Sequence, residues 1–162
     1  MKFWTDGSRV GGPNQDNVIG WSAVCESCVV VAKAKKGGSN INAEIFAIRD
    51  LLLNLSAYRR KMVSQIAEGD KRIDIVTDSK TSIQIIHGYQ RAPHEFDVNE
   101  SENYRAAQAI VESIDSFMEN FGIEVAFEHI RGHQGNLGNV FADYVATSES
   151  GRLLESIQEG RV

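Results

Sequence analysis

The sequence predicts an α/β fold in which helices cover both faces of a five-stranded mixed sheet, with three antiparallel and two parallel strands. Two observations support this prediction. Alternating or Val-rich runs at 2–6, 18–24 and 28–35 follow one another with only loops between them, as in an antiparallel meander. A buried strand at 72–77 leads directly into a helix at 80–89, which is the pattern of a parallel crossover.

The composition fits one globular domain. The chain has 162 residues, of which 42% are hydrophobic and 24% charged, and this is enough to bury a core. We assign residues 1–148 to the folded domain and 149–162 to a weakly patterned C-terminal tail. No apolar run approaches the ~20 residues of a membrane span, and residues 1–6 lack the apolar stretch of a secretory signal. We therefore expect a cytoplasmic monomer with no membrane partner.

The hairpin expected at 18–35 contains both cysteines of the chain. Cys25 and Cys28 flank a Glu26-Ser27 turn between two Val-rich runs. Such a pair can be half of a structural zinc site, a redox pair or a chance pair, but zinc needs two further ligands that do not follow here. The favoured interpretation is two reduced thiols beside a hairpin turn. The glycine-rich residues 7–17 are expected to form a loop.

A long helix is expected from 42 to about 61, because Ile48, Leu51 and Leu55 recur at helical spacing and form one apolar stripe. Glu44 lies four residues before Ile48, on the same stripe. A carboxylate that faces the core is costly unless it is paired or bound to a metal ion. The alternative is a first-turn acid that favours the helix dipole, and the pattern alone leaves both open.

Two further acids follow strands. Asp6 ends the first strand, and Asp78 comes directly after the strand at 72–77. The meander lies on one side of the first strand, so the crossover must return on its other side and make these two strands neighbours. Ligands of such sheets bind at the carboxyl ends of the strands. Asp6 and Asp78 are therefore expected to meet, with Glu44 above them, although an Asp in the position of Asp78 also caps helices.

After residue 89 we expect an exposed loop at 90–103, a helix at 104–120 and a strand at 123–130. The loop contains Pro93 and several acids. A glycine-framed loop then holds His133, and a short helix opens at Asn139 with Asp143 one turn in.

Four short motifs occur in the order and spacing of a known family. They are Thr5-Asp6-Gly7-Ser8, Asn42-Ala43-Glu44, Thr77-Asp78-Ser79, and Gly132-His133-x-Gly135 followed by Asn139-x-x-Ala142-Asp143. Together they resemble the type 1 ribonuclease H (ribonuclease HI) family. The resemblance covers nearly the whole chain and implies the ribonuclease H-like fold, which agrees with the sheet expected from the pattern. Residues 1–148 would then be the catalytic domain.

The resemblance implies an endonuclease that hydrolyses the RNA strand of RNA/DNA hybrids by two-metal-ion catalysis and leaves 5'-phosphate and 3'-hydroxyl ends. The expected cofactor is a pair of Mg²⁺ ions, for which Mn²⁺ can substitute, because hard oxygen ligands suit these ions and not zinc. The ligands carried over from the motifs are Asp6, Glu44, Asp78 and Asp143, with Asp6 bridging the two ions. His133 carries over as an auxiliary proton relay. Its alternative is a plain surface residue.

The resemblance also implies which residues bind the hybrid. Selectivity for RNA requires contact with the 2'-hydroxyl, usually across the wide minor groove. The expected contact residues are Gly7, Ser8, Ser39, Asn40 and Tyr89. Ser39 matches a contact to a DNA phosphate, and Tyr89 matches an aromatic that lies against the DNA sugar backbone. A helix-end Tyr89 suits packing on the core equally well.

The substrate side departs from the family in two places. Ile41 stands where many relatives have a second Asn, and the segment 90–103 is acidic where well-studied bacterial relatives have a basic helix and loop. The net charge of −5 also works against capture of nucleic acid. We expect weaker hybrid binding or reliance on a partner for targeting. The basic cluster Arg59-Arg60-Lys61 either compensates or is a solvated helix end.

Two other functions fit part of the pattern. Resolvases, transposases and exonucleases of the same fold share the metal-binding acids, but usually lack the Gly-His-x-Gly loop with Asn-x-x-Ala-Asp. A catalytically inactive nucleic-acid-binding module is the second alternative, and the presence of all four acids argues against it. The hybrid nuclease is therefore the favoured function.

Overall fold

A computed structural model describes residues 1–11, 16–132 and 135–161 of the chain. The elements in chain order are β1 (Lys2–Val10), β2 (Val18–Val24), β3 (Val29–Lys36), α1 (Asn40–Tyr58), α2 (Arg60–Glu68), β4 (Arg72–Thr77), α3 (Lys80–Arg91), the 3-10 turn η1 (Pro93–Glu95), α4 (Glu102–Phe121), β5 (Glu124–His129) and α5 (Leu137–Gln158).

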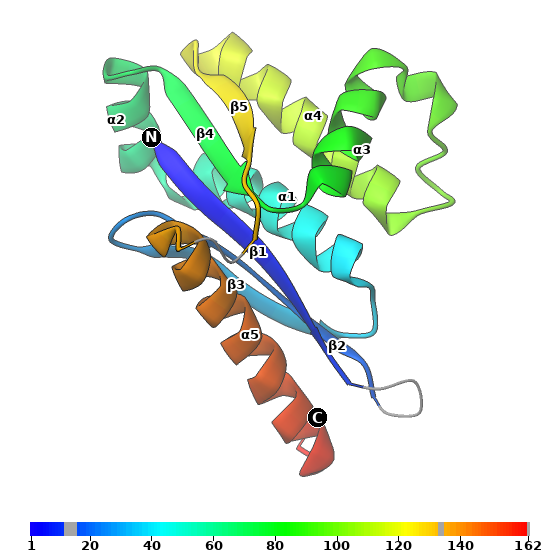
Figure 1. Cartoon of the computed structure of the whole chain (residues 1–162). Coiled ribbons are helices and arrows are strands. Elements are labelled where there is room, and N and C mark those ends of the chain that lie inside the picture. Colours follow the sequence, from blue (N-terminus) through cyan, green and yellow to red (C-terminus); the bar gives the residue numbers. More distant parts are fainter. Residues whose placement is uncertain (12–15, 133–134, 162) are drawn as a thin grey trace.

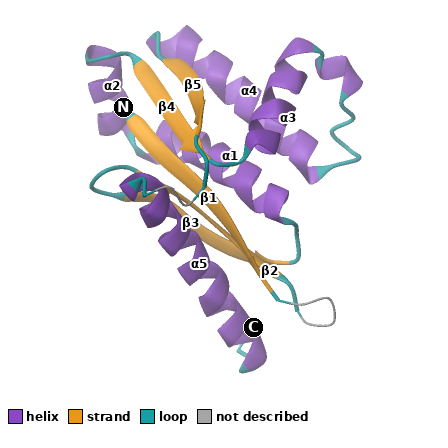
Figure 2. Ribbon diagram, viewed as in Figure 1, coloured by secondary structure: helices purple, strands orange, loops and turns teal. Residues whose placement is uncertain are grey.

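One mixed sheet runs through the molecule in the order β3-β2-β1-β4-β5 (Figures 1 and 2). The strand β2 pairs antiparallel with both β1 and β3, whereas β4 pairs parallel with β1 and with β5. The predicted fold class is therefore confirmed, including the neighbourhood of the first and fourth strands. The crossover places β4 beside β1 because the meander already occupies the other edge of β1.

Helices cover both faces of this sheet unequally. Figure 1 shows α5 alone on one face, where it packs on β1, β2 and β3. The other helices lie on the opposite face and enclose the main core, which includes Phe3, Ile48, Leu52 and Ile110. A smaller cluster under α5 is formed by Trp4, Val24, Val76 and Ala142. Over the described residues, no helix is long and apolar enough to cross a membrane.

The strand β1 continues to Val10, so the expectation of a loop from residue 7 onward was wrong at its start. The residues from Gly7 to Val10 pair with β2 in unbroken register. A glycine is needed at position 7 because a Cβ there would lie 2.7 Å from the Cβ of Ala43 and from the backbone N of Glu44. The missing side chain therefore allows the first turn of α1 to lie directly on β1.

Two helices occupy the range where one long helix was expected, 42–61. The first, α1, begins slightly earlier than predicted, at Asn40, and ends at Tyr58, and α2 follows from Arg60. The junction is Arg59, whose φ and ψ of −118° and 44° are not helical. The basic cluster Arg59-Arg60-Lys61 thus lies at this junction, where the Nε of Arg59 donates to the side chain of Asn54 at 3.4 Å.

The last helix is longer than expected. The sequence predicted a short helix and then a tail, but α5 runs over 22 residues to Gln158, so the boundary proposed at residue 148 falls inside it. Its buried face contains the small residues Ala142, Ala146 and Ser150. A Cβ at Gly20 of β2 would collide with the backbone oxygen of Ala146. The helix therefore packs on the sheet through small residues, and it lacks the stripe of large apolar residues from which a helix is normally predicted.

The two cysteines are not reduced thiols. A disulfide joins Cys25 and Cys28, whose Cα atoms lie 5.2 Å apart across the turn between β2 and β3. The backbone N–H of Cys25 also donates to the carbonyl oxygen of Cys28 at 2.8 Å. The predicted hairpin turn is correct, but the redox state inferred for its thiols was wrong. The hairpin geometry explains the outcome, because it brings the two Cα atoms within bonding range.

Candidate metal centre and active site

Three carboxylates from distant parts of the sequence meet at one edge of the sheet. They belong to Asp6 of β1, Glu44 of α1 and Asp78, which directly follows β4, and one oxygen of each lies within 4.8 Å of the others. The register explains the meeting of the two aspartates. Trp4 pairs with Val76 in the parallel ladder, and each aspartate comes two residues later on its own strand. Side chains two residues apart share one face of a strand.

The start of α1 brings the glutamate to this edge. Ser39 caps the helix, and its hydroxyl accepts from the N–H of Asn42 at 3.1 Å, while the Asn42 side chain accepts from the N–H of Ser39 at 2.8 Å. This capping box fixes where the helix begins. Because Gly7 permits close contact with Ala43, the next residue of the helix, Glu44, lies beside Asp6.

Burial and mutual repulsion make this cluster costly while it carries no cation. Asp6 is only 5% exposed. Its burial and the charges of Asp78 and Asp143 raise the pKa of Asp6 to about 7, against the opposing effect of the Gly7 N–H, which donates to Oδ1 at 2.9 Å. Burial, followed by the charges of Asp6 and Asp78, raises the pKa of Glu44 well above its usual value.

The cluster has the ligand chemistry of a divalent cation site. The Oε2 atom of Glu44 is buried and has no hydrogen-bond partner among the described residues. An unpaired buried carboxylate oxygen is expensive, and a cation would offset both this cost and the repulsion. The three donors are all carboxylates, with no Cys or His among them. Hard oxygen ligands of this kind fit Mg²⁺ or Mn²⁺ and do not favour zinc.

The fourth acid comes from α5, the helix that covers the face of the sheet carrying Trp4. Asp143 lies on α5 and does not belong to the cluster within 4.8 Å, yet its charge contributes to the raised pKa of Asp6. Two glycines position this region. A Cβ at Gly138 would collide with the indole of Trp4, and a Cβ at Gly132 would lie 2.9 Å from Oδ2 of Asp78. The loop and the start of α5 can therefore pack directly against the strands that carry the aspartates.

One histidine among the described residues lies close to the site. His133, the predicted proton relay, lies outside the described residues. His129, at the end of β5, was not singled out from the sequence, although its Nε2 lies 3.2 Å from the backbone oxygen of Asp78. The signal that could have found it is the parallel register, in which Thr77 pairs with His129. A residue opposite the last position of β4 must lie near the carboxylate that follows that strand.

Four of the five expected substrate-binding residues lie near the acidic cluster, on β1 or at the start of α1, whereas Tyr89 lies near the end of α3. Ser39 and Asn40 are exposed at the start of α1, and Gly7 is partly exposed on β1. The hydroxyl of Ser8 shares a hydrogen bond with that of Ser150 in α5, at 3.1 Å. Tyr89 is half-buried, packs on the main core, and has its ring centroid 5.9 Å from that of Phe96.

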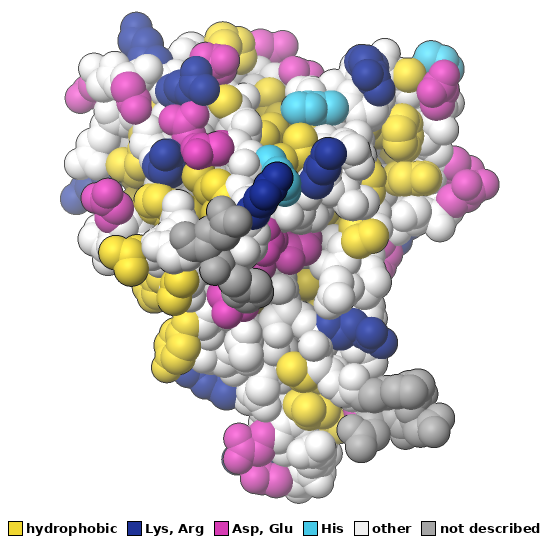
Figure 3. Space-filling view, in the orientation of Figure 1, with side chains coloured by type: hydrophobic (Ala, Val, Ile, Leu, Met, Phe, Trp, Pro, Cys, Tyr) yellow, Lys and Arg dark blue, Asp and Glu magenta, His cyan; other side chains and the backbone are white. Residues whose placement is uncertain are grey.

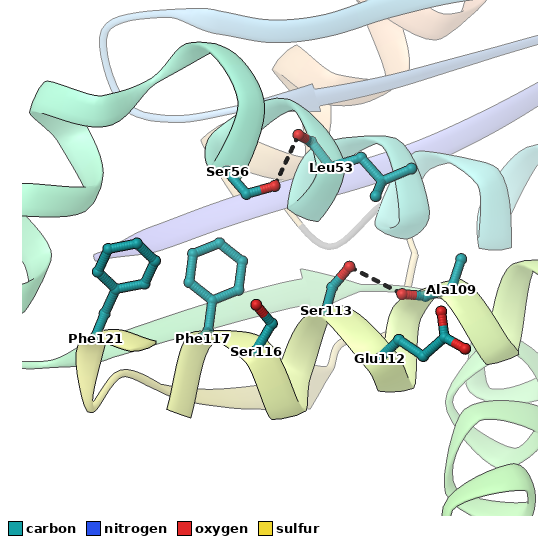
Figure 4. Close-up of a pocket in the computed structure, with 8 residues that line it drawn as sticks. All are labelled: Leu53, Ser56, Ala109, Glu112, Ser113, Ser116, Phe117 and Phe121. Atoms are coloured by element: carbon teal, nitrogen blue, oxygen red, sulfur yellow. Dashed lines mark hydrogen bonds between the residues drawn. The ribbon is translucent and has the colours of Figure 1, made fainter. Parts of the chain in front are cut away.

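Acidic side chains gather near the middle of the face seen in Figure 3, and Lys and Arg side chains lie close to them. Elsewhere, a groove of about 200 Å³ lies between α1 and α4 (Figure 4). Its hydroxyls bond within their own helices, since Ser56 donates to the backbone oxygen of Leu53 and Ser113 to that of Ala109. Glu112 is its only charged lining residue. The groove therefore lacks the convergent polar groups of the acidic cluster.

Comparison with known proteins identifies the family. A family model described as RNase H matches residues 1–150. The chain belongs to the RNase H family. This finding confirms the resemblance drawn from the four motifs. No curated protein matches the chain.

Solved RNase H structures share the fold at low sequence identity. RNase H1 from the halophilic archaeon Halobacterium salinarum is 18% identical, with a TM-score of 0.56 over 93% of this chain and 97% of that one. The N-terminal RNase H domain of a Mycobacterium tuberculosis protein is 16% identical, with a TM-score of 0.55 over 97% and 99%. The foamy viral protease-reverse transcriptase in complex with RNA/DNA hybrid is 17% identical, with a TM-score of 0.57 over 92% of this chain and 20% of that one.

Proposed function

We propose that this RNase H family protein is an endonuclease that hydrolyses the RNA strand of RNA/DNA hybrids and leaves 5'-phosphate and 3'-hydroxyl ends. The observation that carries the proposal is the cluster of Asp6, Glu44 and Asp78, with an unpartnered buried oxygen on Glu44. Family membership over residues 1–150 supports the same reaction class. We assign catalysis to residues 1–148.

Divalent cations fit the cluster. Two Mg²⁺ ions, or Mn²⁺ in their place, would be held by Asp6, Glu44, Asp78 and Asp143. When bound, such a pair supplies charge neutralisation at the phosphate and lowers the pKa of the attacking water. The carboxylates must be ionised to hold cations, so the raised pKa of Asp6 makes cation binding compete with protons near neutral pH.

The protein's own groups would do the remaining work. The burial of Asp6 and the close approach of Gly132 to Asp78, where a Cβ would lie 2.9 Å from Oδ2, would hold the carboxylates in place before substrate arrives, so that little reorganisation is needed during the reaction. His133, in the Gly-His-x-Gly motif, is proposed to relay a proton during turnover or product release. Its loss should slow the enzyme without abolishing activity.

The hybrid would be bound around the middle of β1 and the carboxyl end of β4. Gly7, Ser8, Ser39 and Asn40 surround this edge, and Tyr89 is the proposed contact to the DNA strand. The foamy viral structure, whose domain has the same fold, is of a complex with RNA/DNA hybrid. The acidic segment 90–103 would weaken electrostatic capture of the backbone, and we propose that a monomer of this protein relies on a partner for targeting.

A substrate panel tests the proposal. The protein is incubated with labelled RNA/DNA hybrid, RNA duplex, DNA duplex and branched DNA, each with Mg²⁺ and with chelator. We expect cutting of the RNA strand of the hybrid alone, and only with Mg²⁺. Cutting of branched DNA alone would point to a resolvase of the same fold. Binding of hybrid without cutting in Mg²⁺ or Mn²⁺ would indicate an inactive binding module.

A further inference from the structure

The segment that precedes α1 contains two adjacent glycines. Gly37 and Gly38 have φ of +78° and +104°, in the region that glycine adopts far more readily than other residues. They lead into Ser39 and Asn40, two of the residues proposed to contact the hybrid. Two adjacent glycines lose much conformational entropy when they are ordered, so this segment needs contacts from elsewhere to hold one conformation.

Such contacts come from both sides. On one side, the side chain of Asn17 donates to the backbone oxygen of Gly38 at 2.7 Å, and its backbone oxygen accepts from the N–H of Gly37 at 2.6 Å. On the other side, the side-chain oxygen of Asn42 accepts from the N–H of Ser39 at 2.8 Å. The position of the segment therefore depends on what orients the Asn42 amide.

Asn103 orients that amide from a distant part of the chain. The Nδ2 of Asn42 donates to Oδ1 of Asn103 at 2.6 Å, across 61 residues of sequence. The direction of this hydrogen bond is fixed. Asn42 must turn its side-chain oxygen toward the N–H of Ser39, so it can offer only its N–H₂ group to Asn103. Position 103 must therefore present an acceptor.

Asn103 is itself held in the first turn of α4. Its backbone N–H donates to the hydroxyl of the cap residue Ser101 at 3.1 Å. A second contact joins the same turn to β3, since Nζ of Lys35 lies 3.2 Å from Oε1 of Glu102. This second pair is exposed on both sides, and such pairs stabilise little. The Asn42–Asn103 hydrogen bond is partly buried and is the stronger of the two links.

We propose that Asn103 is a positioning residue for hybrid binding, which acts through Asn42 on the backbone of residues 37–40. The expected effect on the KM for the hybrid rests on the proposed function. The expected effect on the conformation of residues 37–40 does not. It gives the end of the acidic segment 90–103 a role that its charge does not suggest. The segment does not grip the hybrid but instead supports the residues that do.

Three variants test the proposal. Asn103→Leu removes the acceptor, Asn103→Asp retains it, and Asn99→Leu is the matched control, because Asn99 is exposed in the same segment and its side chain makes no hydrogen bond in the described structure. We expect Asn103→Leu to raise the KM for the hybrid about 3- to 10-fold with kcat within about twofold, as the loss of one hydrogen bond predicts. Asn103→Asp and Asn99→Leu should stay near the parent protein. A fall in kcat at unchanged KM would overturn the proposal.

Hydrogen exchange separates this inference from the proposed function. The Ser39 amide reports directly on the segment, because it donates to Asn42. In Asn103→Leu this amide should exchange about 3- to 10-fold faster than in the parent, whereas Asn103→Asp and Asn99→Leu should leave its exchange unchanged. The shift in Asn103→Leu is expected even if no hybrid is cut. Unchanged protection of Ser39 in Asn103→Leu would overturn the positioning role whatever the enzyme's substrate.

Discussion

The protein buries carboxylates in two places and treats them differently. Asp50 of α1 is 6% exposed and accepts hydrogen bonds from Nε1 of Trp21 and Nε of Arg49, both at 2.8 Å, with Nζ of Lys33 at 3.2 Å. Burial alone would raise the pKa of Asp50, but the hydrogen bonds from Arg49 and Trp21 and the nearby positive charges bring it below its usual value. Asp6 is as deeply buried, yet its charged neighbours are acids.

This difference marks Asp50 as a structural acid and supports the metal-binding role proposed for Asp6. The cost of burying an ionised carboxylate is similar in both places. At Asp50 the chain offsets the cost with its own donors and cations. At Asp6 and Glu44 it does not, so the cost of repulsion and desolvation would be offset only by a bound cation or by a proton. The comparison predicts opposite responses of the two sites to substitution, to pH and to metal ions.

The largest effect should come from neutralising the acids. Asp6→Asn and Asp78→Asn should each reduce hybrid cleavage by roughly 10³-fold or more, because two cations would lose a shared or essential ligand. Asp6→Asn should also raise the melting temperature in chelator at pH 8, since it removes a buried charge among like charges. Cleavage rates and thermal unfolding measure the two effects.

Asp50→Asn is the matched control for that experiment. It should leave kcat within about twofold and lower the free energy of unfolding by about 1–2 kcal/mol, because the ion pairs with Arg49 and Lys33 are lost. Stability that falls equally in Asp6→Asn and Asp50→Asn would contradict the distinction between the two sites.

The two sites should give stability opposite slopes with pH. The pKa of Asp6 is raised to about 7 in the folded state, so the folded protein holds a proton that the unfolded chain has lost between about pH 4 and pH 7. Its contribution to stability is complete below pH 4 and is lost as pH rises through 7, at up to ~4 kcal/mol. Asp50, whose pKa is lowered, contributes stability above pH 4 and loses it on acidification.

Urea unfolding from pH 4 to pH 8 in chelator measures this slope. In Asp6→Asn the loss of stability toward pH 8 should shrink, and in the parent protein millimolar Mg²⁺ should reduce it as well, because cations replace the missing protons. A parent protein whose pH profile matches that of Asp6→Asn and does not respond to Mg²⁺ would rule out the buried acids as the metal site.

A smaller effect should follow from moving one acid relative to the others. Gly7→Ala places a Cβ 2.7 Å from the Cβ of Ala43, so the start of α1 and with it Glu44 must shift away from Asp6. We expect a loss of about 1–3 kcal/mol in stability and roughly 10²-fold in kcat. Gly151→Ala, where a Cβ meets nothing within 4 Å, should be neutral or stabilising. Equal behaviour of the two variants would show that close contact at Gly7 does not set the site.

Much of this site could be predicted from the sequence because regular geometry carries it. The strand β4 was predicted at its observed bounds, and a parallel neighbour of β1 necessarily brings Asp78 near Asp6. The apolar stripe of the expected helix predicted that Glu44 lies on its core-facing side. In each case, a period of 2 or 3.6 residues links the sequence to a position in space.

The features that were missed depend on contacts that leave no periodic signal. The length of α5 was missed because its buried face is made of Ala142, Ala146 and Ser150, which pack by being small. The break at Arg59 and the disulfide of the β2–β3 turn depend on local backbone geometry. The Asn42–Asn103 hydrogen bond joins two ordinary polar residues that only the folded chain brings together.

The smallest effect should come from exposed acids, which are neither buried in ion pairs like Asp50 nor part of the acidic cluster like Asp6. Glu95 and Glu100 lie in the acidic segment and make no ion pair among the described residues. Replacing both with Lys should tighten hybrid binding about 3- to 10-fold at low salt and steepen its salt dependence, because added cations displace counterions from the phosphate backbone. Asp115→Lys with Glu119→Lys makes the same charge change on α4. Fluorescence anisotropy of labelled hybrid in chelator compares the pairs, and equal gains would mean that net charge, and not the position of the segment, limits capture of the hybrid.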